Sequence, residues 1–155
     1  MDFSLRVTVS FKPVDSGLFH AAASKGFKSG GTQTSGKRLI NAPEWTFGAS
    51  ADYTRELFGN DGFVRLEWMH RGNQLSSTFA LRYERFPFIS PSYDVVNLRV
   101  GFSNERWGVN VYAENLFDEN YYSGAYEKAF YSGVYVEPSV RSFGVNFSYR
   151  FGADR

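Results

Sequence analysis

The chain has 155 residues, which is enough for one domain with a sizeable core. Its 17 basic and 16 acidic residues nearly cancel, which argues against a nucleic-acid-binding protein, and the absence of cysteine excludes disulfides and thiolate metal sites. Aromatic residues make up 19% of the sequence, a share that favours β-strands. No apolar run approaches the roughly 18 residues of a membrane-spanning helix, whereas transmembrane β-barrels are compatible with this composition.

Seven segments alternate apolar and polar side chains, and this alternation predicts half-buried β-strands. The first segment, for example, puts Leu5, Val7 and Val9 on one face and Arg6 and Thr8 on the other. In chain order, the predicted strands are residues 3–11, 18–27, 45–54, 64–71, 95–103, 107–115 and 141–151.

Short and long connections alternate between these strands. The short ones, residues 13–17, 59–62 and 103–106, carry the Gly, Asn, Asp and Ser residues of tight turns. The long ones span residues 28–44, 72–92 and 118–140. Short turns at one end and long loops at the other are typical of an outer-membrane barrel.

The polar face of the predicted strands carries charged side chains that need water. The charged residues at strand centres are Arg6, Lys12, Asp52, Arg65, Glu67, Arg99 and Glu114. One apolar face and one hydrated face fit a wide barrel with lipid outside and water inside. The alternative at this point is an antiparallel sheet of a soluble protein with one face in solvent.

No motif for catalysis or metal binding stands out. Residues 31–38 match a phosphate-binding G-x-x-x-x-G-K pattern, but Arg38 holds the place of the Ser or Thr that would bind magnesium. The two histidines, His20 and His70, have no ligand-type partner three or four residues away, so a zinc site is not expected. We therefore expect neither an enzyme nor a cofactor.

The segment 118–135 is rich in tyrosine, serine and glycine, and it contains Tyr-Ser-Gly twice. These residue types build adaptable recognition surfaces. An aromatic belt or ordinary loop packing explains the composition equally well. The composition therefore makes this segment a candidate binding loop without deciding its role.

Four short motifs resemble segments of the barrel of TonB-dependent receptors, in that family's order. They are Gly-Phe-Lys-Ser-Gly-Gly at residues 26–31, Gly-Lys-Arg-Leu-Ile-Asn-Ala-Pro-Glu-Trp at 36–45, Asn-Leu-Phe-Asp-Glu-Asn-Tyr at 115–121 and Tyr-Arg-Phe at 149–151. Together they cover the chain from about residue 26 to residue 151, and they resemble the C-terminal part of the barrel. The last strand is similar to the strand that the barrel-assembly machinery reads. Its signal would be the alternating residues Phe143, Val145, Phe147, Tyr149 and Phe151.

The resemblance implies an all-β fold. We expect an antiparallel meander of about seven strands that forms part of a transmembrane barrel, which has about 22 strands in the family. In this chain the meander would be an open curved sheet or a small barrel, with a partial barrel domain at residues 1–151 and a tail at 152–155. Unpaired edge strands would make the chain aggregate or insert poorly when alone.

The resemblance also implies a function, the TonB-energised import of a ferric siderophore or similar scarce nutrient across the bacterial outer membrane. The expected partners are outer-membrane lipid, the barrel-assembly machinery, the ligand, and the N-terminal barrel strands and plug of a parent receptor, through which TonB acts. No plug, TonB box or signal peptide is recognisable in the sequence, so we expect a fragment that does not transport alone.

Candidate ligand contacts are aromatic and basic residues of the long loops, expected to close over a ligand at the outer mouth. They are Tyr121, Tyr122, Tyr126, Phe130, Tyr131, Arg82 and Arg85. A second motif is expected to be structural, because Asn and Asp side chains bond to local backbone where a strand leaves the membrane. It consists of Asn115, Leu116, Phe117 and Asp118.

Two other interpretations stay open. A complete small outer-membrane barrel, acting as an adhesin or structural protein, would need an eighth strand, for which residues 77–86 are the candidate. A soluble β-sandwich would use the tyrosine-rich segment as the binding site of a recognition module.

Overall fold

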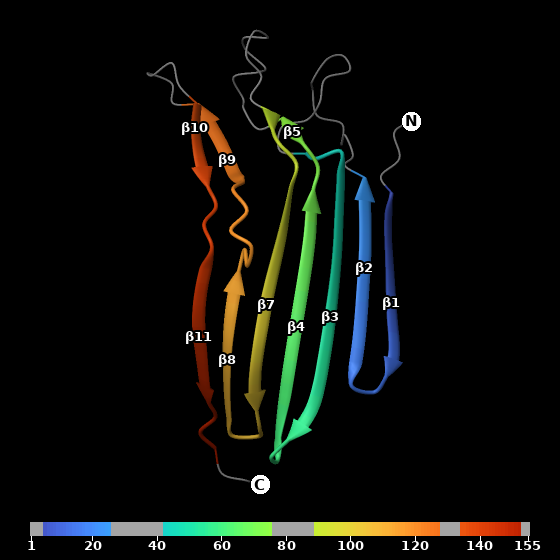
Figure 1. Ribbon diagram of the computed structural model, residues 1–155, viewed down its shortest axis with the longest axis vertical. Coiled ribbons are helices and arrows are strands. Elements are labelled where there is room, and N and C mark those ends of the chain that lie inside the picture. The colour runs from blue at the N-terminus through green and yellow to red at the C-terminus, as the bar shows by residue number, and fades with distance from the viewer. Residues whose placement is uncertain (1–4, 26–41, 76–88, 128–133, 153–155) are drawn as a thin grey trace.

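A computed structural model describes residues 5–25, 42–75, 89–127 and 134–152. Seven long strands form one antiparallel sheet, which confirms the all-β fold that the sequence predicts (Figure 1). Their order across the sheet is β1 (Arg6–Val14), β2 (Gly17–Lys25), β3 (Trp45–Leu57), β4 (Asn60–Arg71), β7 (Tyr93–Ser103), β8 (Trp107–Glu114) and β11 (Ser142–Tyr149). Among the described strands, β1 and β11 each have a neighbour on one side only, so the sheet is open and not a small closed barrel.

Within the described ranges, no helix has the length and apolar character needed to cross a membrane.

Four short strands form two hairpins at the loop end of the sheet (Figure 1). Their pairs are β5 (Gln74–Leu75) with β6 (Ile89–Ser90), and β9 (Tyr122–Glu127) with β10 (Val134–Pro138). The connections expected as loops therefore contain paired strands. Alternation could not reveal them, because β5 and β6 have two residues each and β9 lies in the Tyr-Ser-Gly-rich segment. The eighth strand expected at residues 77–86 lies outside the described residues.

The β3–β4 turn lies at Phe58 and Gly59, not at residues 59–62 as the sequence predicts. The φ angles of these two residues are 55° and 71°, and Leu57 and Asn60 pair directly on either side. Positive φ at both central positions gives a two-residue type I′ turn, the connection that best matches strand twist. The turn therefore ends before Asn60, which already belongs to β4.

The other two tight turns lie where the sequence predicts them. Asp15 and Ser16 connect β1 to β2. Between β7 and β8, Asn104 Oδ1 accepts hydrogen bonds from the backbone N–H groups of Arg106 and Trp107, both at 2.9 Å. All three turns lie at the end of the sheet opposite the hairpins (Figure 1).

The register divides the sheet into two chemically different faces. One row of facing residues is Phe11, Phe19, Ala51, Leu66, Leu98, Ala113 and Phe143. The adjacent row is Leu18, Asp52, Arg65, Arg99, Tyr112 and Gly144. Because consecutive side chains point to opposite sides of a sheet, the first row lies on an apolar face and the second on a polar face.

The apolar face is largely uncovered. Phe11, Phe143 and Phe147 are 63%, 68% and 70% exposed. A β-sandwich buries one face of each sheet against another sheet. The described residues form no second sheet over either face, so the soluble sandwich interpretation is wrong. Extended exposed apolar surfaces of this kind mark contact with a membrane or with other protein.

Candidate functional site

The centre of the polar face holds a row of charged and aromatic side chains. Arg65 forms an ion pair with Asp52 of the neighbouring strand, and Arg99 faces Arg65 from the other side. The Arg99 guanidinium lies 5.9 Å from the centre of the Tyr112 ring. Tyr112 in turn covers Gly144, where a β-carbon would collide with the tyrosine ring. Ring packing therefore holds this row together along with charge.

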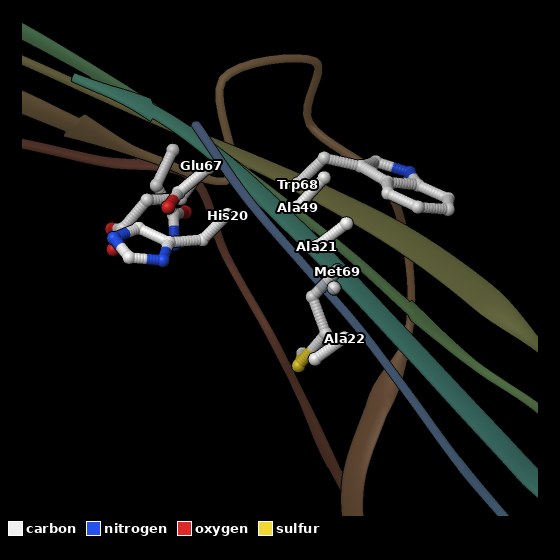
Figure 2. Close-up of a pocket in the computed structure, with 10 residues that line it drawn as sticks. His20, Ala21, Ala22, Ala49, Glu67, Trp68 and Met69 are labelled. Atoms are coloured by element: carbon white, nitrogen blue, oxygen red, sulfur yellow. The ribbon is translucent and has the colours of Figure 1, made fainter. Parts of the chain in front are cut away.

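A hollow of about 400 Å³ lies over the middle of β2, β3 and β4. Figure 2 shows His20 and Glu67 together on one side of the sheet, whereas Trp68 points to the other. His20 Nδ1 lies 2.8 Å from Ser10 Oγ on β1, so a polar contact links the two strands on this face. The small residue Gly48 lines the hollow and leaves room for water or a polar group.

A second hollow, of about 530 Å³, lies nearer the tight turns and is lined by Lys12, Asp52 and Arg65 among others. The described residues bring together no group of His, Asp and Glu that could hold a metal ion. Side chains of both signs on an open wall suit contact with water or with a polar protein segment. They do not form an arrangement of nucleophile, base and oxyanion donors.

Asn115 closes the loop end of β8. It has a φ of 51°, and only 2% of its surface is exposed. Its Nδ2 donates to the Glu119 carbonyl and its Oδ1 accepts from the Glu119 N–H, both at 2.9 Å. Its own N–H donates to Asn97 Oδ1 at 3.0 Å, and its carbonyl accepts from the Asp118 N–H at 2.9 Å. The Asn115 side chain thus satisfies both backbone groups of Glu119, while its own backbone bonds to Asn97 and Asp118.

The rest of this motif makes local contacts as well. Leu116 donates its N–H to the Val96 carbonyl of β7 at 2.8 Å. Asp118 has a φ of 59° and lies 3.8 Å from the Arg141 guanidinium, just before β11. Phe117 is 75% exposed. These contacts tie the end of β8 to β7 and to the start of β11.

The predicted ligand contacts are only partly within the described chain. Tyr121 stacks on Tyr93, with ring centres 4.1 Å apart and 15° between the planes. Tyr122 is the first residue of β9, and Tyr126 lies in the same strand. Phe130, Tyr131, Arg82 and Arg85 lie outside the described residues. The structure therefore places Tyr121 beside β7 at the loop end of the sheet.

The alternating residues of the last strand lie on the apolar face at the β11 edge. Phe143, Val145 and Phe147 are among the most exposed apolar residues of the described chain. Tyr149 packs edge-on against Phe151, with ring centres 4.7 Å apart.

A polar cluster on the apolar face escaped sequence reasoning. Asp94 Oδ1 accepts a hydrogen bond from Trp68 Nε1 at 3.0 Å and lies 3.1 Å from His70 Nδ1. Asp94 follows His70 by 24 residues and lies on the adjacent strand, far beyond the spacing of three or four residues that marks a local ligand pair in a sequence. Strand register brings the two together, and no short-range spacing reveals it.

A second such pair lies at the root of the β5–β6 hairpin. Gln74 and Ser90 face each other in register and are 3% and 1% exposed. Neither Gln74 Oε1 nor Ser90 Oγ has a hydrogen-bond partner in the part of the chain that the structure describes. Buried polar residues in so short a strand leave no hydrophobic pattern, so the sequence carries no signal for them.

A family model described as "TonB dependent receptor-like, beta-barrel" matches residues 2–116. The chain belongs to this family. The match confirms the resemblance that the sequence motifs indicate, and it covers β1 to β8 of the sheet. The family is one of receptors and transporters, not of enzymes, and its barrels are outer-membrane proteins.

The fold is similar to that of the ferric yersiniabactin uptake receptor FyuA from Yersinia pestis, known from a crystal structure. The TM-score is 0.71 at 17% sequence identity, and the likeness covers 93% of this chain. The chain spans 23% of the length of that receptor, so the open sheet matches part of a receptor barrel. No curated protein sequence matches the chain.

Proposed function

We propose that the chain forms seven adjacent strands in the wall of an outer-membrane receptor that imports a ferric siderophore or similar scarce nutrient with energy supplied through TonB. Membership of the TonB-dependent receptor barrel family supports import, and the likeness in fold to a ferric uptake receptor supports an iron complex as the cargo.

The observation that carries this proposal is the open sheet with two different faces. Leu66 is 43% exposed on the apolar face, while the residue before it in β4, Arg65, reaches Asp52 on the polar face. A barrel wall between lipid and a hydrated lumen requires this alternation on every strand. A sheet in water would have to cover the apolar face, and the described residues do not cover it.

The edges of the sheet define the partners that this function requires. Within a bilayer, each unpaired backbone group costs several kcal/mol, so β1 and β11 both need neighbouring strands. We infer that further strands of the receptor pair with them and that a plug occupies the lumen, through which TonB acts. The mixed charges around Asp52, Arg65 and Arg99 suit a hydrated contact with such a plug.

The ends of the sheet have separate proposed roles. At the loop end, the predicted aromatic and basic contacts close over the ligand, and the stacking of Tyr121 on Tyr93 holds the first of them beside the barrel mouth. At the β11 edge, the alternating residues that end in Phe151 present the signal for the barrel-assembly machinery, because they are exposed where a new strand would pair.

The test is uptake of radioactive iron from a panel of ferric siderophores by cells whose outer-membrane receptor contains these strands. Replacing both Tyr121 and Tyr122 with alanine is expected to reduce ligand affinity about tenfold, a usual loss for buried aromatic contacts. Tyr53→Ala, on the apolar face near the tight turns, is the matched control at equal receptor level. If no ferric complex in the panel is taken up in a way that depends on both the receptor and TonB, the proposal is contradicted.

A further inference from the structure

The apolar face carries a pocket that import does not explain. It lies at the loop end of β3 and β4, has a volume of about 510 Å³, and is lined by Glu44, Trp45, Phe47, His70, Asn73 and Ser92 among others. We propose that this pocket binds the saccharide headgroup of a membrane glycolipid whose acyl chain lies on the apolar face below it. The inference rests on the lipid-facing orientation of that face in the proposed function.

The pocket lies where the apolar face meets water. Phe47 faces His70 across the strands, and His70 faces Asp94 on β7. His70 is one residue from the end of β4, so the pair occupies the rim of the sheet. An ionisable pair on a lipid-facing surface is unfavourable unless it has a function, because hydrocarbon solvates charge poorly. A headgroup at this level would give the pair a polar environment.

The charges around the pocket are already matched within the protein. Asp94 is engaged by His70 and by an indole N–H. The Lys25 ammonium lies 5.6 Å from the centre of the Trp45 ring, so a second cation at that ring would be repelled. The carboxylate of Asp94 disfavours a phosphate in the same way. The pocket therefore offers hydrogen-bonding atoms and disfavours ionic headgroups of either sign.

The lining chemistry fits a neutral, hydroxyl-rich ring. A carboxylate only accepts hydrogen bonds, so His70 Nδ1 donates to Asp94, and this contact fixes the orientation of the imidazole ring beside the pocket. Asn73 and Ser92 in the lining are residue types that both donate and accept. The rings of Trp45 and Phe47 are parallel within 4°, with centres 5.8 Å apart, and they give the apolar wall against which the C–H groups of a sugar pack.

A neighbouring groove indicates a lipid and not a free sugar. It has a volume of about 360 Å³ and a mainly apolar surface, although His20 and Ser50 also border it. The apolar residues in its lining include Val9, Phe19, Ala21, Ala49, Leu66 and Trp68. Ala49 and Trp68 lie two residues from Phe47 and His70 on the same face, so the groove leads to the pocket. Only an amphiphile uses both surfaces, with its chain on the groove and its headgroup at the rim.

Three tryptophans provide the test. Trp45 and Trp68 border the site, whereas Trp107 begins β8 at the opposite end of the sheet. In the nitrogen-15-labelled chain folded in alkyl amine-oxide micelles, the indole N–H signals are followed while dodecyl maltoside is added. Dodecylphosphocholine supplies the same chain with a charged headgroup, and maltose supplies the sugar without a chain. We expect the Trp45 and Trp68 signals to shift saturably with dodecyl maltoside alone, and Trp107 to stay unchanged.

A conservative variant tests the role of the polar pair. Asp94→Asn keeps the size of the side chain but removes the charge that orients His70, and it is expected to weaken dodecyl maltoside binding roughly tenfold. Asp61→Asn, at the tight-turn end of β4, is the matched control and is expected to change nothing.

The outcomes separate this site from the proposed function. Equal shifts with dodecylphosphocholine would mean general amphiphile contact, and shifts with maltose would mean a soluble-sugar site; either result overturns the glycolipid proposal alone. An Asp94→Asn chain that binds as tightly as the parent also overturns it. The proposed function is tested separately by the uptake assay, because a chain that lacks its neighbouring strands can fail to fold in micelles whether or not its apolar face meets lipid in the receptor.

Discussion

Asn115 combines a left-handed backbone with an almost fully buried side chain, and few residue types satisfy both conditions. Asparagine enters the left-handed region more readily than most residues because its short polar side chain bonds to nearby backbone. Here the amide both donates to and accepts from Glu119. The turn after β8 therefore depends on the identity of one residue, and a volume-preserving substitution does not replace it.

Asn115→Ala is expected to lower the free energy of unfolding by about 2–4 kcal/mol, because two hydrogen bonds are lost in a buried turn and alanine is strained at positive φ. Urea unfolding of the chain in micelles, followed by tryptophan fluorescence, measures the change. Asn146→Ala is the control, because its bond to Asn110 is long, at 3.3 Å, and exposed. Equal losses for the two variants would show that Asn115 has no special role.

Phe58 is held at a φ of 55° although it is 99% exposed. A β-carbon in the left-handed region costs about 1–2 kcal/mol, and asparagine is the usual residue at this position of a type I′ turn. Phe58→Asn is therefore expected to raise the free energy of unfolding by about 0.5–1 kcal/mol in the same urea assay. Phe58→Ala removes the ring but keeps the strain, so it should give no gain. A gain from alanine as large as that from asparagine would assign the effect to the ring.

At the scale of the strands, the alternation of apolar and polar residues predicts the seven long strands because each strand contributes to both the apolar face and the polar face. The predicted ends are less accurate. The alternation of β3 breaks at Arg55, so its last residues up to Leu57 are missed, although they pair fully with the start of β4. The backbone requirements of the Phe58–Gly59 turn decide where the two strands stop, and an aromatic residue there gives no turn signal.

The candidate sites could be predicted less well than the strands, for a physical reason. The cluster of Trp68, His70 and Asp94 depends on register between β4 and β7, and the pair of Gln74 and Ser90 depends on a hairpin of two-residue strands. Register is set by turn geometry and face matching over a whole strand, not by local spacing. Asn115 was accessible to sequence reasoning because the partner of its side chain, Glu119, lies four residues away.

The two faces of a strand should respond oppositely to the same change. Ala49 and Ser50 are adjacent in β3, one on the apolar face and one on the polar face. Ala49→Arg is expected to cost about 2–4 kcal/mol in a bilayer, as for arginine at the lipid-facing midplane, whereas Ser50→Arg points to the hydrated side near Glu67 and should cost less than about 1 kcal/mol. Flotation of the refolded chain with phospholipid vesicles, at increasing urea, compares the two. If both variants float equally, the apolar face does not meet lipid.

The sheet as a whole buries few apolar side chains, although its strands carry many of them. In the described chain the buried apolar residues are Tyr93, Val95 and Ala113, so internal packing alone supplies little of the apolar burial that stabilises a globular domain. Lipid on one face and further strands at β1 and β11 would supply the rest. The stability of the folded sheet therefore depends on lipid and neighbouring strands more than the stability of a globular domain does.

Gel mobility in dodecyl sulfate shows whether the sheet closes into a barrel. A closed barrel has no edge strand with unpaired backbone groups, so it stays folded in dodecyl sulfate until it is heated. The described sheet ends at β1 and β11, and its edges expose backbone groups to the detergent. We expect the chain, refolded alone into phospholipid vesicles, to migrate at the same position in dodecyl sulfate gels with and without heating, and to self-associate in water through its apolar face. A heated sample that migrates differently from an unheated monomer would mean that β1 and β11 meet, and the chain would then be a small barrel in its own right.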